Sequence, residues 1–80
     1  MYLAVKEVKP ANNYNLILTF ENGEIRQFDM NPYLNIGIFK ELKDVALFNT
    51  VHLSFDTIEW NNQADLDPEL LYNNSTRLDK

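Results

Sequence analysis

Cysteine is absent from this sequence of 80 residues, and glycine occurs only twice. Without cysteine, the chain can form neither a disulfide nor a metal site built from thiolates. Two glycines cannot supply the glycine-rich loop that surrounds the phosphates of a nucleotide. The sequence therefore excludes a disulfide-stapled domain and the common nucleotide-binding loops.

Long apolar runs are also missing. No stretch approaches the ~20 apolar residues that span a bilayer. The N-terminus lacks the basic start and the apolar segment of a secretory signal peptide. We therefore expect a cytoplasmic protein that does not contact a membrane.

Basic residues are scarce, with 7 against 12 acidic residues and a net charge of −5. They are scattered along the chain: Lys6, Lys9, Arg26, Lys40, Lys43, Arg77 and Lys80. Surfaces that bind phosphate backbones or anionic lipids carry clustered Lys and Arg. This distribution argues against direct nucleic-acid binding and favours a basic protein as a partner.

Length and composition predict one domain over residues 1–80. A hydrophobic content of 45% and an aromatic content of 12% are globular values. A chain this short buries only about 60% of its unfolded surface, so its stability is marginal. The core must come from Phe, Trp, Leu and Ile packing, helped by self-association or a partner.

The clearest structural signal is a β-hairpin over residues 14–30, with Asn22-Gly23 as its turn. Asn and Gly tolerate the positive φ angles of a two-residue type I′ turn. Such a turn sets the register and places Phe20 opposite Ile25 and Ile17 opposite Phe28. Leu18 then lies opposite Gln27.

This register predicts apolar side chains on both faces of the hairpin. One face holds Leu16, Leu18, Phe20 and Ile25, and the other holds Ile17, Thr19, Arg26 and Phe28. The first face forms a contiguous core stripe. We therefore predict that the second face leaves an exposed apolar patch, with Ile17, Phe28 and Arg26 as the candidate interaction residues.

The rest of the chain predicts short elements. A first strand over Leu3, Val5 and Val8 ends at Pro10, and a string of helical turns follows the hairpin, one of them capped by Asp44. A second hairpin joins residues 51–55 to 58–60 by a turn longer than two residues at Asp56-Thr57. Asp67 caps a last helix, and residues 73–80 form a flexible tail. The predicted fold is α+β: a small antiparallel sheet of about five short strands in two hairpins, with short helices and a C-terminal helix.

Three features resemble chemical sites, and each has a structural explanation. Asp65, Asp67 and Glu69 are spaced like the start of a calcium loop, but the glycine and glutamate that complete the loop are missing. These acids fit a helix cap instead. His52 is predicted to face solvent on a strand, and Trp60 to lie in the core. We therefore expect no catalytic, cofactor-binding or metal-binding residue.

The order of residues resembles that of small bacterial proteins grouped as domain of unknown function 2442. The match runs from about Val5 to Tyr72 and is most specific between Trp60 and Pro68. Its residues are Val5, Val8, Pro10, Tyr14, Leu16, Leu18, Phe20, Asn22, Gly23, Arg26, Phe28, Asp29, Gly37, Phe39, Leu42, Asp44, Phe48, Val51, Trp60, Ala64, Asp65, Leu66, Asp67 and Pro68.

One departure from the family pattern has a physical consequence. The family usually has glycine before the Ala64-Asp65-Leu66 segment, where this chain has Gln63. If that position has positive φ, Gln63 is strained by about 1 kcal/mol, unless the turn has moved onto Asn62.

The resemblance implies a compact α+β domain without assigned chemistry. The resemblance also implies a gene arrangement. Some members are encoded beside a second small protein, and this arrangement looks like a toxin–antitoxin pair. The leading prediction is a non-enzymatic protein-interaction module, as the acidic, antitoxin-like partner of a small basic protein. The alternatives are a structural homodimer and a small enzyme without a recognisable site.

Overall fold

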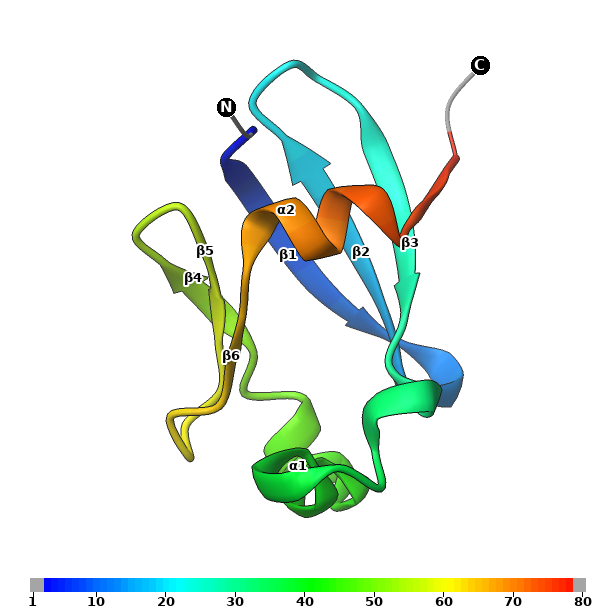
Figure 1. Cartoon of the computed structure of the whole chain (residues 1–80), viewed down its shortest axis with the longest axis vertical. Helices are drawn as coiled ribbons and strands as arrows, with labels where there is room; N and C mark the ends of the chain where they lie inside the picture. Colours follow the sequence, from blue (N-terminus) through cyan, green and yellow to red (C-terminus); the bar gives the residue numbers. More distant parts are fainter. Residues whose placement is uncertain (1–2, 79–80) are drawn as a thin grey trace.

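The computed structural model describes residues 3–78, which form two antiparallel sheets side by side (Figure 1). The larger sheet has the order β1-β2-β3-β7, with strands Val5–Ala11, Asn15–Phe20, Ile25–Asp29 and Thr76–Arg77. The smaller has the order β4-β5-β6, with strands His52–Ser54, Thr57–Glu59 and Asp65–Leu66. The predicted α+β class is confirmed. Strands β6 and β7, of two residues each, were not foreseen.

Short helical elements join and cover the sheets. Helix α1 (Val45–Phe48) and helix α2 (Pro68–Asn73) begin at the two predicted N-caps. The Asp44 side chain accepts from the Ala46 N–H, and Asp67 from the Glu69 N–H. Helix α2 lies across one face of the larger sheet (Figure 1). The 3₁₀ turns are Asn12–Tyr14, Asn31–Tyr33 and Gly37–Lys43.

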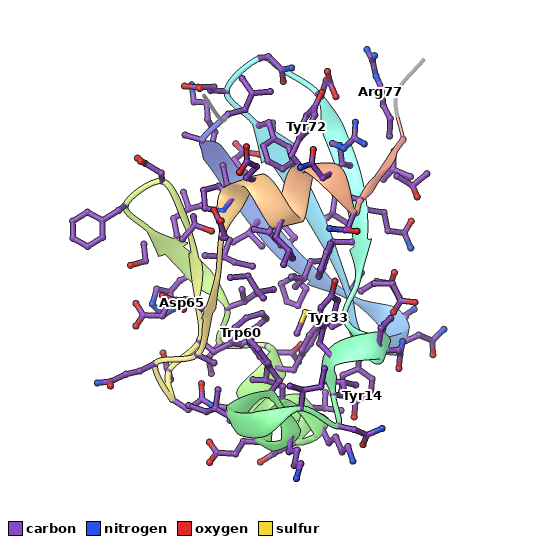
Figure 2. The ribbon with its side chains drawn as sticks, viewed as in Figure 1. Tyr14, Tyr33, Trp60, Asp65, Tyr72 and Arg77 are labelled. Carbon is purple, nitrogen blue, oxygen red and sulfur yellow. The ribbon has the colours of Figure 1, made fainter. Side chains whose placement is uncertain are left out.

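The core lies between the larger sheet, α2 and the smaller sheet. It contains Val5, Leu16, Leu18, Phe20, Phe28, Met30, Leu34, Leu42, Phe48, Val51, Ile58, Trp60, Ala64, Leu66 and Leu71. Trp60 is 1% exposed, which confirms that it is a core residue. Its Nε1 donates a 2.9 Å hydrogen bond to the Phe48 carbonyl, so the polar end of the indole ring is also satisfied (Figure 2).

The predicted register of the β2–β3 hairpin is wrong by one residue. Ile25 lies opposite Thr19, and Phe28 lies opposite Leu16. The cause is the turn, in which the Phe20 N–H donates to the Glu24 carbonyl and only Gly23 has positive φ, at 89°. This is a three-residue loop with a glycine bulge rather than a type I′ turn.

A shift of one residue exchanges the faces of a whole strand. Phe28 therefore joins Leu16 and Leu18 in the core and is 1% exposed, while Ile25 moves to the outer face and is 39% exposed. Ile17 lies opposite Gln27 and Lys9 on that outer face. The predicted apolar patch that combined Ile17 with Phe28 does not exist.

The β5–β6 connection repeats the geometry of the β2–β3 turn. The Trp60 N–H donates to the Ala64 carbonyl, and the Gln63 N–H to the Trp60 carbonyl. Asn62 Oδ1 accepts from the Ala64 N–H at 3.1 Å. Gln63 therefore occupies the position that Gly23 has in the first turn, with φ of 72°. The predicted strain lies at Gln63 and not at Asn62.

Replacing Gln63 by glycine is expected to raise the free energy of unfolding by about 0.5–1 kcal/mol, because glycine adopts positive φ without a Cβ clash. Chemical denaturation of the variant measures the gain. Gln63→Ala is the control and should give none, because alanine keeps the clash. Gly23→Gln should show the reverse effect in the matching turn. Equal stability of Gln63→Gly and Gln63→Ala would contradict the assignment.

The predicted tail contains structure up to the end of the described residues. Asn73 ends α2, Ser75 is buried, and β7 pairs with β3 through Arg77 opposite Arg26. The Leu78 N–H donates to the Ile25 carbonyl at 2.8 Å. Positions 79 and 80 of the predicted tail, like positions 1 and 2, lie outside the described residues.

Candidate functional site

The structure does not bring the three predicted interaction residues together. Phe28 is in the core, and Ile17 is half-buried on the outer face of β2. Arg26 lies opposite Leu18, on the side of the sheet that α2 covers. A role for Ile17 or Arg26 in binding stays a prediction, but one continuous surface cannot contain all three.

Arg26 is instead the centre of a network that attaches the C-terminal segment. Its guanidinium donates to Glu24 Oε1 at 2.8 Å, to Ser75 Oγ at 2.7 Å and to the Ser75 carbonyl at 2.8 Å. It also stacks 4.4 Å from the centre of the Tyr72 ring, a cation–π contact. The Tyr72 hydroxyl donates to the Glu24 carboxylate at 3.0 Å (Figure 2). These contacts hold α2 and β7 against β3.

The network controls the ionisation of Glu24. Desolvation alone would raise the pKa of this carboxyl, but hydrogen bonds from Arg26, Tyr72 and Asn22 and the charge of Arg77 outweigh it. The pKa of Glu24 therefore lies below its usual value of 4.5.

A depressed carboxyl pKa means that the folded state is stabilised above the unfolded pKa, and that this stabilisation is lost as the pH falls through the folded pKa. We expect Glu24→Gln to lower the denaturation midpoint at pH 7, and to lower it by less at an acidic pH well below 4.5. Paired urea titrations at the two pH values measure this. If the midpoints of the variant and the wild type differ by the same amount at both pH values, the charge of Glu24 does not contribute to stability.

His52 and Asp67, two of the side chains that the sequence singled out, have structural partners. His52 contacts the Thr50 carbonyl at 2.8 Å and Glu59 at 3.9 Å, on the exposed face of β4. Asp67 caps α2, while Asp65 is exposed on β6. Within residues 3–78, no three His, Cys, Asp or Glu side chains gather as a metal would require.

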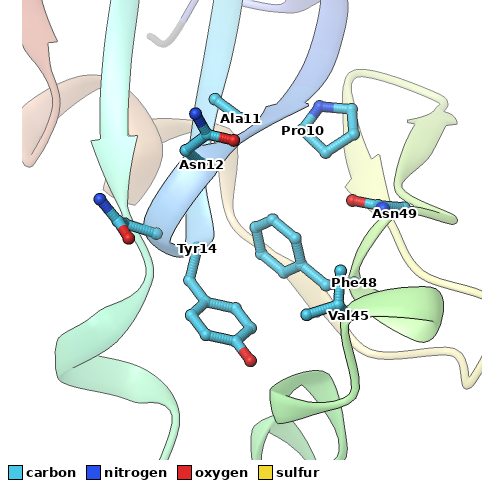
Figure 3. Close-up of a pocket in the computed structure, with 8 residues that line it drawn as sticks. Pro10, Ala11, Asn12, Tyr14, Val45, Phe48 and Asn49 are labelled. Atoms are coloured by element: carbon cyan, nitrogen blue, oxygen red, sulfur yellow. The ribbon is translucent and has the colours of Figure 1, made fainter.

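A pocket of about 410 Å³ lies between the β1–β2 turn and α1 (Figure 3). One side is formed by the turn and the other by the helix and the residue that follows it. The lining residues are Pro10, Ala11, Asn12, Asn13, Tyr14, Val45, Phe48 and Asn49. The Tyr14 and Phe48 rings meet edge to face, with centres 5.3 Å apart.

The turn beside the pocket is held in an uncommon backbone conformation. Asn13 and Tyr14 both have φ of 60°, a region that side chains with a Cβ rarely adopt. The Asn31 and Asn15 side chains donate to the Asn13 carbonyl at 2.8 and 3.0 Å, and the Tyr14 hydroxyl donates to the Lys43 carbonyl. These bonds fix the aromatic wall in place.

The pocket wall contains no carboxyl, amine or imidazole group. Its surface is made of amides, aromatic rings and small apolar side chains, which suit an uncharged apolar or aromatic group. The sequence did not predict this pocket. Its only local signal is the Asn12-Asn13 pair, which is typical of a turn.

The second unforeseen feature is Phe55. Strands β4 and β5 pair up to Ser54 and Thr57, so the loop holds only Phe55 and Asp56, and the longer turn that was predicted is wrong. Phe55 has φ of 57° and is 100% exposed. The loop projects from one side of the molecule (Figure 1).

Comparisons with known proteins give a family but no function. A search of curated proteins and a search of solved structures each found no match. In the described part of the chain, no helix has the length and apolar character to cross a membrane. The family model described as protein of unknown function (DUF2442) matches residues 5–77, nearly the whole chain. The chain therefore belongs to the DUF2442 family.

Proposed function

We propose that this chain is a non-enzymatic protein-interaction module whose contact residue is Phe55. The observation that supports this is the combination of full exposure and positive φ at one phenylalanine. Water contact with a phenyl ring is unfavourable by about 1.5–3 kcal/mol relative to burial. The left-handed backbone costs roughly another 1–2 kcal/mol for a residue with a Cβ.

Asparagine or glycine would relieve both costs at this position without disturbing the core. The backbone of the loop is already held by the Val5 N–H, which donates to the Asp56 carbonyl at 2.9 Å. The fold therefore gains little from the phenyl ring. A binding partner would gain a rigid aromatic anchor, the type of side chain that dominates protein interfaces.

The chemistry of the pocket favours binding over catalysis. Its walls carry amide and aromatic groups, and Tyr14, the one ionisable residue among them, is bound through its hydroxyl to the Lys43 carbonyl. Catalysis requires a nucleophile, or an acid or base that exchanges protons near neutral pH. The pocket is thus better suited to holding a side chain than to transforming a substrate.

Two kinds of partner fit the proposal, and the net charge of −5 favours the first of them. The first is a small basic protein encoded beside this one, in an antitoxin-like pairing, which charge complementarity would support. The second is another copy of the same chain, for which the uncharged pocket is the favourable observation.

Light scattering on the purified chain, alone and with the product of the adjacent gene, tests the proposal. We expect the wild type to associate in at least one of the two samples, and Phe55→Asn to remain folded and lose that association. Leu78→Asn is the matched control, because Leu78 is also an exposed large apolar residue but lies on the C-terminal segment. A chain that stays monomeric in both samples would refute the proposed function.

A further inference from the structure

We propose that Phe55 of one copy inserts into the pocket between the β1–β2 turn and α1 of a second copy, so that the chain works as a homodimer. This inference rests on the proposed interaction function and names its partner. It joins the two features of the structure that the fold does not explain: a protruding phenyl ring and an aromatic-lined pocket.

The inserted group fits the pocket chemically. A phenyl ring is uncharged, and none of the lining residues is charged. The pocket volume of about 410 Å³ is at the lower end of the ~300–1,000 Å³ range of ligand sites, which suits one side chain and not an extended ligand. An incoming ring can contact Tyr14, which is partly exposed, edge to face, the geometry that aromatic pairs prefer, whereas Phe48 is only 2% exposed.

Insertion would also cover exposed apolar surface on the receiving copy. Val45 forms one wall of the pocket and is 57% exposed in the isolated chain. Figure 3 shows Pro10 and Ala11 at the upper edge of the pocket and Val45 at its lower edge, with the Phe48 ring between them in this view. A phenyl ring in the pocket removes apolar area on both copies from water, which is the main source of association free energy.

The chain topology allows the exchange to be reciprocal. Phe48 and Asn49 line the pocket, and the chain continues from them into β4, which ends one residue before Phe55. The Phe55 ring and the pocket therefore lie at the two ends of one short segment. A two-fold axis beside that segment would place each Phe55 at the other copy's pocket, which closes the assembly as a dimer.

The dependence of association on salt concentration distinguishes a second copy from a basic partner. Two copies, each with a charge of −5, repel one another, and added salt screens that repulsion. We expect the dimer to tighten at least twofold when NaCl is raised from about 50 to 500 mM. A complex with a basic protein should weaken over the same range.

Mixing two variants gives the sharpest test. Phe55→Asn removes the phenyl ring and keeps the pocket, whereas Val45→Glu places a charge in the pocket and keeps the phenyl ring. Val45 is exposed at the start of α1, where an acidic side chain suits the helix dipole, so the fold should tolerate this change. Val45→Gln, an uncharged second pocket variant, covers the case in which Val45→Glu does not fold.

Sedimentation equilibrium is the measurement. Each variant alone should dimerise at least tenfold more weakly than the wild type, and an equimolar mixture should regain association because one phenyl–pocket contact forms. Phe55→Ala should dimerise as poorly as Phe55→Asn but melt at a lower temperature, because alanine keeps the strained backbone.

Three results would overturn the inference: a wild type that is monomeric at millimolar concentration, a pocket variant that dimerises normally, or a mixture that regains nothing. A monomeric wild type that still binds the product of the adjacent gene would overturn the homodimer alone and leave the proposed interaction function in place.

Discussion

Replacing Trp60 by alanine is expected to lower the free energy of unfolding by about 3–5 kcal/mol. A domain of 80 residues has a total of roughly 4–12 kcal/mol, so the variant should be largely unfolded or close to it. The large effect has a structural reason: Trp60 is 1% exposed and contacts Phe39 and Phe48, whose ring centres lie 6.5 and 6.1 Å from its own. Its removal leaves a cavity where the smaller sheet meets α1.

Urea denaturation followed by far-UV circular dichroism measures the loss. Trp60→Phe is the control, because it keeps an aromatic ring and removes the hydrogen bond to the Phe48 carbonyl. Trp60→Phe should lower the free energy of unfolding by less than Trp60→Ala does. Its cost is about 1–3 kcal/mol, because one buried acceptor is left unpaired. A Trp60→Ala variant with a wild-type midpoint would show that Trp60 is not part of the core.

Phe28→Ala is expected to cost about 3–5 kcal/mol, whereas Ile17→Thr should change the stability by less than about 1 kcal/mol. Phe28 is 1% exposed, lies opposite Leu16 and stacks on Tyr33 at 5.5 Å. Ile17 is half-buried on the outer face, and threonine retains its β-branch there.

The comparison tests the register of the hairpin directly. A type I′ turn would place Ile17 and Phe28 opposite each other on one face, so the two substitutions would then affect the same surface. The three-residue loop places them on opposite faces, so only Phe28→Ala should be severe. Denaturation midpoints that fall by similar amounts in the two variants would contradict the observed register.

Local rules of sequence predicted the elements that depend on neighbouring residues. Asp44 and Asp67 cap their helices because a short acidic side chain can reach the N–H two residues ahead. The alternation around Ile58 and Trp60 identified the second hairpin. The α+β class followed from these elements, and the resemblance to the family located the strained Gln63.

The exact turn geometry was beyond local rules, because Asn22-Gly23 fits both a two-residue and a three-residue loop. The two alternatives differ in which face of β3 enters the core, and packing of Phe28 against Tyr33 and β2 selects one. Strand β7 was missed for a related reason. Two residues carry no periodicity, and Thr76–Arg77 pair with β3 next to the Arg26–Ser75 contacts.

The two candidate functional features depend on the tertiary structure entirely. The pocket forms because the turn at Asn13 and Tyr14 meets α1, more than 30 residues later in the chain. Phe55 looked like one more apolar residue in an alternating strand, and only the early turn after Ser54 leaves it exposed. The sequence by itself determined the helix caps, the hairpins and the α+β class, since these follow from interactions within a few residues. The tertiary structure decided the register, the pocket and the exposure of Phe55, because each depends on which distant segments pack together.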